Sequence, residues 1–114
     1  MTPAGRILGP PLNQPMTLDQ FRRTLDGASP PEGLTAPLRA LWLDGRGDWD
    51  QAHRVAGDVE AATGAWVHAY LHRKEGDLEN AAYWYRRAGK PAATSALDDE
   101  WAAIVTLLLS RVND

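Results

Sequence analysis

The chain has 114 residues, of which 44% are hydrophobic and 24% are charged, a balance typical of one soluble domain with its own core. Twelve Lys and Arg against fifteen Asp and Glu give a formal net charge of -3, which argues against nucleic acid as a partner. The absence of cysteine excludes disulfides and thiolate metal sites, and it is compatible with the cytoplasm, where we expect the protein to stay. The longest apolar run, 101–109, is about half of the ~20 residues that a membrane helix needs, so we expect no membrane contact.

Residues 1–34 are predicted to form a Pro-rich arm with one short helix. Six of the eight prolines lie in the first 31 residues, and each restricts its own φ and disfavours helix in the residue before it. The exception is the segment that begins at Thr17, where Thr17 and Gln20 have the spacing of a capping box and Gly27 supplies a stop. The apolar face of this helix, formed by Leu18, Phe21 and Leu25, predicts that it docks onto the rest of the chain.

Residues 35–114 are predicted to be all-α, because apolar residues recur there with helical spacing and nowhere with the period of two typical of strands. Glycines and N-cap residues divide this part into five helices. The expected helices run from Thr35 to Asp44, from Asp48 to Thr63, from about Ala65 to Glu75, from Asp77 to Ala88, and from Ser95 towards the carboxy terminus. We therefore expect one helical domain without a sheet.

An internal repeat joins four of these helices into two pairs. Ala40 precedes Gly47-Asp48 by the same spacing as Ala69 precedes Gly76-Asp77, and the two copies are offset by 29 residues. Each copy predicts a helix, a glycine turn, an aspartate cap and a second helix that begins with a small inward-facing alanine, which is a helical hairpin.

The second copy resembles the second half of a tetratricopeptide repeat. The resemblance rests on Gly76-Asp77 with an apolar and an acidic residue after it, and it extends over about residues 35–91. Its further positions are Ala69, Ala81, Tyr85, Ala88 and Pro91. The resemblance implies antiparallel hairpins that bind a protein or peptide, here with the helices near Thr17 and Ser95 as caps at either end. The segment 68–89 is also similar to small uncharacterised bacterial proteins, a likeness that implies no activity.

Trp66, Tyr70 and Arg73 are the candidate partner surface. In tetratricopeptide repeats the positions of Trp66 and Tyr70 face the groove, and Arg73 continues their stripe three residues on. Aromatic residues are enriched at interfaces as well as in cores. The alternative is that these side chains pack under the carboxy-terminal helix or the arm.

His68 and His72 form a second candidate site, since their spacing of four residues places both imidazoles on one helix face, where they could share a divalent metal. A third ligand would have to come from elsewhere, with Asp77 or His53 conceivable. Because no firm third ligand is apparent, we expect core or rim histidines, no stoichiometric metal and no cofactor.

These patterns favour an interaction module that binds an unidentified protein or peptide, with no catalytic residue. The rival hypothesis is a metal- or small-ligand-binding protein, or a hydrolase, that uses His68, His72 and Asp77. A third possibility is a homodimer through the carboxy-terminal helix, whose apolar stripe cannot cover both Leu107 and Leu109. The arm, with Ile7 and Leu8, is the alternative cover for that helix.

Overall fold

The computed structural model of the chain describes residues 16–59 and 61–111, and within these ranges it contains six helices and no strand. The helices are α1 (Leu18–Thr24), α2 (Ala36–Gly45), α3 (Trp49–Gly57), α4 (Ala62–Glu75), α5 (Leu78–Ala88) and α6 (Leu97–Ser110). They account for 68% of the described residues. The predicted all-α fold class is confirmed.

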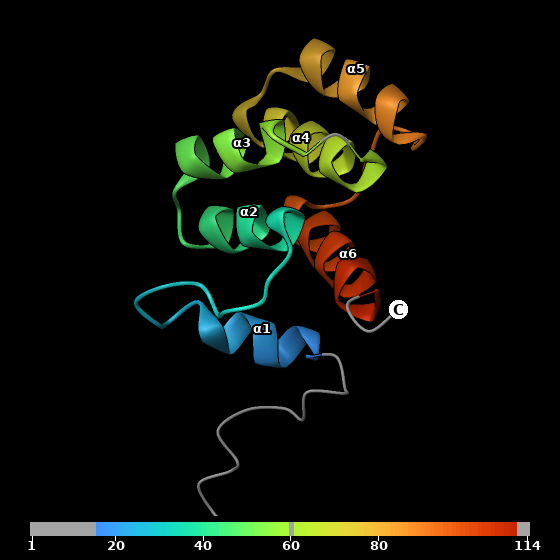
Figure 1. Cartoon of the computed structure of the whole chain (residues 1–114). Coiled ribbons are helices and arrows are strands. Elements are labelled where there is room, and N and C mark those ends of the chain that lie inside the picture. The colour runs from blue at the N-terminus through green and yellow to red at the C-terminus, as the bar shows by residue number, and fades with distance from the viewer. Residues whose placement is uncertain (1–15, 60, 112–114) are drawn as a thin grey trace, which may run out of the picture.

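Two helical hairpins, α2–α3 and α4–α5, form the body of the molecule and lie one above the other in Figure 1. The turns follow the repeat, because Gly47 and Gly76 both have positive φ, 88° and 92°, which glycine adopts without steric cost. The Asp48 carboxylate accepts a hydrogen bond from the backbone N–H of Gln51 at 3.1 Å, and Asp77 caps α5 in the same way. The glycine–aspartate motif therefore marks both hairpin turns.

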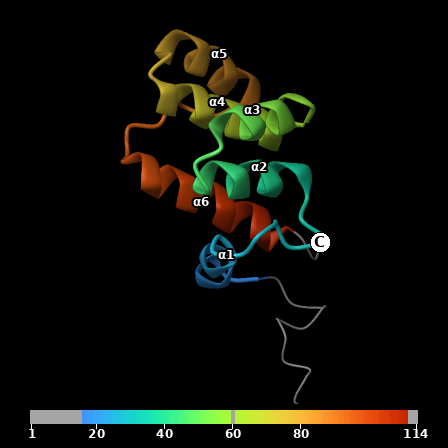
Figure 2. The same ribbon diagram turned by 90° about the vertical axis from the view of Figure 1, so that its left-hand side faces the viewer.

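The main core lies between α2, α4 and α6, with contributions from α1 and α3. Its largest fully buried side chains include Phe21, Leu38, Leu41, Val67, Leu71 and Ile104. A smaller apolar cluster of Ala69, Ala81 and Tyr85 lies where α4 packs against α5. Figure 2 shows α6 running beside α2 and α4, and α6 contacts both of these helices and α1.

Two predicted boundaries around α4 are wrong. Thr63 and Gly64, expected to end the second helix of the first hairpin, instead lie in the first turn of α4, while α3 ends at Gly57 and leaves Val59 outside it. The reason is close packing: a Cβ built on Gly64 would lie 2.6 Å from the Cβ of Val59. Gly64 thus permits a close contact and does not break a helix.

Two other helix ends also differ from prediction. α1 ends at Thr24, before Gly27, although its predicted capping box is present, with the Thr17 side chain accepting from the backbone N–H of Gln20. α6 begins at Leu97, with Ala96 and not Ser95 at its N-cap.

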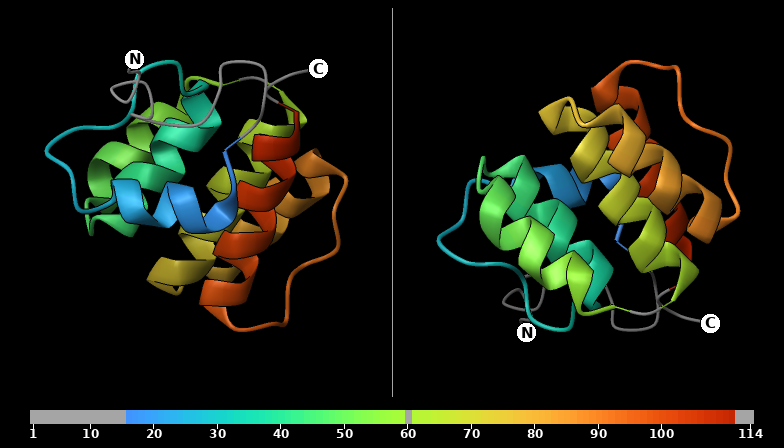
Figure 3. Two further views of the ribbon diagram at one scale, coloured as in Figure 1. Left: turned by 90° about the horizontal axis from the view of Figure 1, so that it is seen from below. Right: turned by 90° about the horizontal axis from the view of Figure 1, so that it is seen from above.

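α1 and α6 flank the hairpins and contact each other, as the view from below in Figure 3 shows. On α6, Leu109 is buried and Leu107 is half-buried. The arm residues Ile7 and Leu8, predicted to cover this helix, lie outside the described residues, as does Val112, which is predicted to be the last residue of the helix's apolar stripe. No helix in the described ranges is both long and apolar enough to cross a bilayer.

Candidate functional site

Trp66 and Arg73 hold α6 onto α4, whereas Tyr70 joins α4 to α2. Tyr70 is buried, and its hydroxyl donates to Asp44 Oδ2 at 3.2 Å. Trp66 Nε1 donates to Glu100 Oε2 at 3.1 Å, and Arg73 Nη1 donates to Glu100 Oε1 at 2.8 Å. Arg73 also donates to the carbonyl of Ser95. Trp66 and Arg73 thus pack against the carboxy-terminal helix, which is the alternative left open by the sequence, and a partner that used these two side chains would have to displace α6.

Glu100 is the centre of this contact. Its carboxylate, only 3% exposed, also accepts a hydrogen bond from Tyr85 Oη at 2.6 Å. Burial, followed by the hydrogen bond to Glu100, raises the pKa of Tyr85 well above its ordinary value. Burial, followed by the charge of Asp44, does the same for Tyr70. Both phenols therefore remain donors at neutral pH.

The histidines, by contrast, converge. His53 of α3 lies beside His68 and His72 of α4, and one ring nitrogen of each lies within 4.8 Å of the other two. The Nε2 atoms of His53 and His72 are 3.3 Å apart. His68 and His72 are buried and His53 is half-buried, so the cluster reaches solvent on the α3 side. We call these three residues the histidine cluster.

Two tryptophans fix the orientation of the cluster. The ring of Trp49 stacks on His53 with centroids 4.9 Å apart and an interplanar angle of 7°, and Trp84 of α5 stacks on His68 at 3.9 Å and 9°. Trp49 is itself anchored, since its Nε1 donates to the carbonyl of Leu71 at 2.8 Å. Because His53 and His68 each stack on a tryptophan, their ring nitrogens have little rotational freedom.

Glu75 determines the tautomer of His72. The distance between His72 Nδ1 and Glu75 Oε2 is 2.7 Å, and because a carboxylate only accepts, the Nδ1–H group donates this hydrogen bond. In the neutral imidazole the lone pair then lies on Nε2, the atom that faces His53. Hydrogen bonding of the distal ring nitrogen to a carboxylate is the arrangement that orients metal-ligating histidines.

Asp77 lies near His72 but outside the histidine cluster. It belongs to a second group, with His72 and Glu75, whose ligand atoms lie within 4.8 Å of one another, and it does not join His68. Its carboxylate also accepts from the backbone N–H of Asn80 at 3.3 Å as the cap of α5. Of the two conceivable third ligands, His53 is thus the one that meets both His68 and His72.

Burial favours the neutral form of two of the three imidazoles, those of His53 and His68. Burial, and then the proximity of His53 and His72, lowers the pKa of His68 from 6.5 to about 4. Burial, and then His72, also lowers the pKa of His53. Neutral imidazoles offer the lone pairs that a metal ion needs.

The sequence contained one indication that His53 belongs to the site, and this indication lies in α3 and not in α4. Trp49 and His53 are four residues apart on α3, as His68 and His72 are on α4, so each helix presents a two-residue stripe. What the sequence alone lacked was the register of α3 against α4, which decides whether the two stripes face each other. A comparison of the chain with protein-family models, with curated proteins and with solved structures found no match.

Proposed function

We propose that this protein binds one divalent transition-metal ion through His53, His68 and His72. The observation that carries the proposal is the 3.3 Å separation of the Nε2 atoms of His53 and His72. Two Zn–N bonds of about 2.0–2.1 Å at a tetrahedral angle place their nitrogens about 3.3–3.4 Å apart. The two atoms therefore already have the spacing of ligands that share a metal.

The donor set indicates which ions fit. Three neutral imidazoles suit Zn²⁺, Co²⁺, Ni²⁺ or Cu²⁺, whereas Mg²⁺ and Ca²⁺ prefer oxygen ligands. Three protein ligands also leave the fourth position of a tetrahedral ion to water or to an added ligand. Glu75, which accepts a hydrogen bond from His72, would act as the positioning residue outside the ligand set.

This proposal revises the expectation of a metal-free protein, which rested on the lack of a firm third ligand. It follows the rival hypothesis with His53 in place of Asp77. Since His53 belongs to the first hairpin and the other two ligands to the second, a bound ion would join the two hairpins. Such an ion binds the folded chain in preference to the unfolded chain and stabilises it accordingly.

The test uses full-length protein without a histidine tag, so that the three natural histidines are the only ones in the sample. After removal of metal with EDTA, we expect calorimetric titration to give one Zn²⁺ per chain. Co²⁺ should produce the visible absorption of a tetrahedral nitrogen site. His53→Gln, His68→Gln and His72→Gln should each abolish or strongly weaken binding.

Glu75 and Glu79 provide a matched pair of variants, because both are exposed carboxylates and only Glu75 contacts a ligand. Glu75→Gln should weaken Zn²⁺ binding about 10–100-fold. Glu79→Gln should leave the affinity unchanged. Failure of the wild-type protein to bind Zn²⁺, or equal affinity in wild type and His53→Gln, would overturn the proposal.

A further inference from the structure

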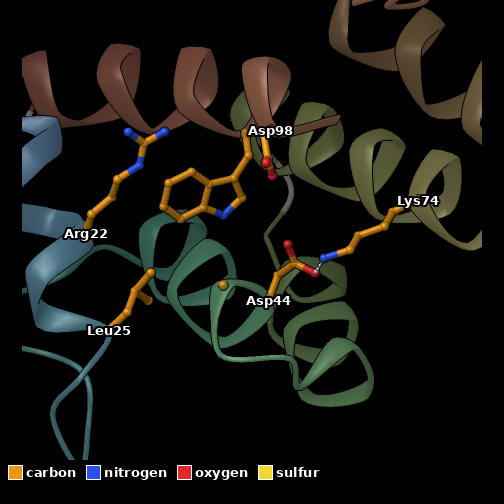
Figure 4. A pocket seen from close by; sticks show the side chains of 7 residues that line it. Arg22, Leu25, Asp44, Lys74 and Asp98 are labelled. Atoms are coloured by element: carbon orange, nitrogen blue, oxygen red, sulfur yellow. Dashed lines mark hydrogen bonds and ion pairs between the residues drawn. The ribbon is translucent and has the colours of Figure 1, made fainter. Parts of the chain in front are cut away.

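A hollow separate from the histidine cluster lies where α1, α2, α4 and α6 meet. It has a volume of about 360 Å³. Its lining consists of Arg22, Leu25, Asp44, Gly45, Lys74, Asp98 and Trp101. Figure 4 shows Arg22 and Leu25 on one side of the hollow and Asp44, Lys74 and Asp98 on the other. The volume is at the lower end of the range for small-molecule sites.

Trp101 forms part of the apolar lining. The residue is only 7% exposed, and its Nε1 donates to the carbonyl of Leu41 at 3.0 Å, so the polar edge of the ring is already satisfied. A Cβ built on Gly45 would lie 3.1 Å from the methyl carbons of Leu25 and 3.3 Å from Trp101 Cζ2. The absence of a side chain at Gly45 therefore keeps α1, α2 and α6 close together at Trp101.

Two of the four charged side chains around the hollow form an ion pair with each other. Asp44 is buried and accepts from Tyr70 at 3.2 Å and from Lys74 Nζ at 3.0 Å, so Asp44 and Lys74 neutralise each other. Within residues 16–59 and 61–111, neither Arg22 nor Asp98 has an ion pair. The carbon centre of the Arg22 guanidinium lies 5.7 Å from the centroid of Trp101.

The hollow thus presents one net positive charge on the Arg22 side and one net negative charge on the Asp98 side, with the indole as part of its apolar lining. We propose that it binds a small linear zwitterion, an ω-amino carboxylic acid, with its carboxylate at Arg22, its ammonium at Asp98 and its methylene chain between them against Leu25 and Trp101. A guanidinium recognises a carboxylate by paired hydrogen bonds, and apolar side chains favour contact with an alkyl chain. A ligand with a single charge would leave the group at the other end unpaired.

The experiment follows the indole N–H signal of Trp101 by NMR in isotope-labelled full-length protein, with Trp101→Phe to assign it. The probes are ε-aminocaproate, γ-aminobutyrate, caproate and hexylamine. We expect ε-aminocaproate to shift the signal with a Kd of about 0.1–1 mM, and caproate and hexylamine to bind about tenfold more weakly.

Adjacent exposed residues of the same charge serve as matched controls. Arg22→Gln should weaken ε-aminocaproate about tenfold and leave hexylamine unchanged, and Asp98→Asn should weaken it equally and leave caproate unchanged. Arg23 and Asp99 are exposed and do not line the hollow. Arg23→Gln and Asp99→Asn should therefore leave the affinities for ε-aminocaproate, hexylamine and caproate unchanged. Thermal melting verifies that all four variants fold.

Two results would overturn the proposal. One is the absence of any shift of the Trp101 signal with ε-aminocaproate at about 10 mM, a concentration that detects even weak binding. The other is an equal loss of affinity in Arg22→Gln and Arg23→Gln, which would indicate general charge attraction at the surface. Neither result bears on the histidine cluster, whose residues do not line the hollow.

Discussion

Replacing Glu100 by alanine should be among the most destabilising single changes in this chain, because three donors on two other helices lose their common acceptor. Trp66, Arg73 and Tyr85 donate to its carboxylate over 3.1, 2.8 and 2.6 Å. Hydrogen bonds to a charged group contribute about 1.5–3 kcal/mol each. Removal of one partner from a buried ion pair costs about 3–5 kcal/mol, since the other charge stays desolvated.

The sum of three such bonds overstates the loss. The Trp66 ring is half-buried and Arg73 keeps its hydrogen bond to the Ser95 carbonyl, so both donors retain or regain a partner. The buried Tyr85 hydroxyl, in contrast, loses the acceptor of its O–H. We therefore expect Glu100→Ala to lower the free energy of unfolding by about 3–5 kcal/mol, measured by urea denaturation followed by circular dichroism.

Asp99→Ala is the control for this prediction. Asp99 is exposed and lies in the same first turn of α6, so its removal takes away the same favourable interaction with the helix dipole without touching the buried contact. A difference between the two variants of less than about 1 kcal/mol would refute the view that Glu100 fastens α6 to the second hairpin.

Three other perturbations have defined outcomes. Ala81→Leu should overpack the α4–α5 contact by about 1–3 kcal/mol, whereas the same change at the half-buried Ala82 should cost less; an unchanged denaturant midpoint at Ala81 would contradict the repeat alignment. Gly64→Ala should destabilise by about 1–3 kcal/mol, because its Cβ would lie 2.6 Å from that of Val59; calorimetry that shows an unaltered Tm would mean that the close contact is absent. In metal-free protein, the free energy of unfolding should depend on pH through His68. Folding lowers the pKa of His68 from 6.5 to about 4, so between pH 6.5 and pH 4 the unfolded chain binds a proton at His68 that the folded chain does not. The free energy of unfolding should be greatest above pH 6.5 and fall by about 1–2 kcal/mol towards pH 4, and His68→Gln should reduce this fall.

Local signals in the sequence predicted most of the helices. The glycine–aspartate pairs at 47–48 and 76–77 place a residue with positive φ directly before an N-cap, and this chemistry acts within one turn of helix. The capping box at Thr17 acts over the same range. The prediction for Gly64 was wrong because the role of this glycine depends on its contact with Val59. The sequence does not distinguish a glycine required for a close contact from one required for a positive φ.

The candidate sites were less predictable, because they depend on which faces of different helices meet. The sequence could place His68 and His72 on one stripe of α4 and Trp66, Tyr70 and Arg73 on another. It could not show that α6 covers the second stripe through Glu100, or that α3 brings His53 to the first. Both facts depend on helix packing, and helical spacing alone leaves the partner of each face undetermined.

Two opposite faces of α4 contact different parts of the described structure. Residues two positions apart lie about 200° apart around a helix, so His68 points away from the side on which Trp66 and Tyr70 meet Glu100 and Asp44. α4 is buried over most of its length, because it packs against α2, α3, α5 and α6. With α6 fastened on one face by a buried carboxylate, the opposite face does not have to hold the fold together by hydrophobic contact alone. This face carries His68 and His72, and His53 of α3 meets them there. Under the proposal of a shared metal ion, the bound ion would stabilise the packing of the two hairpins at this face.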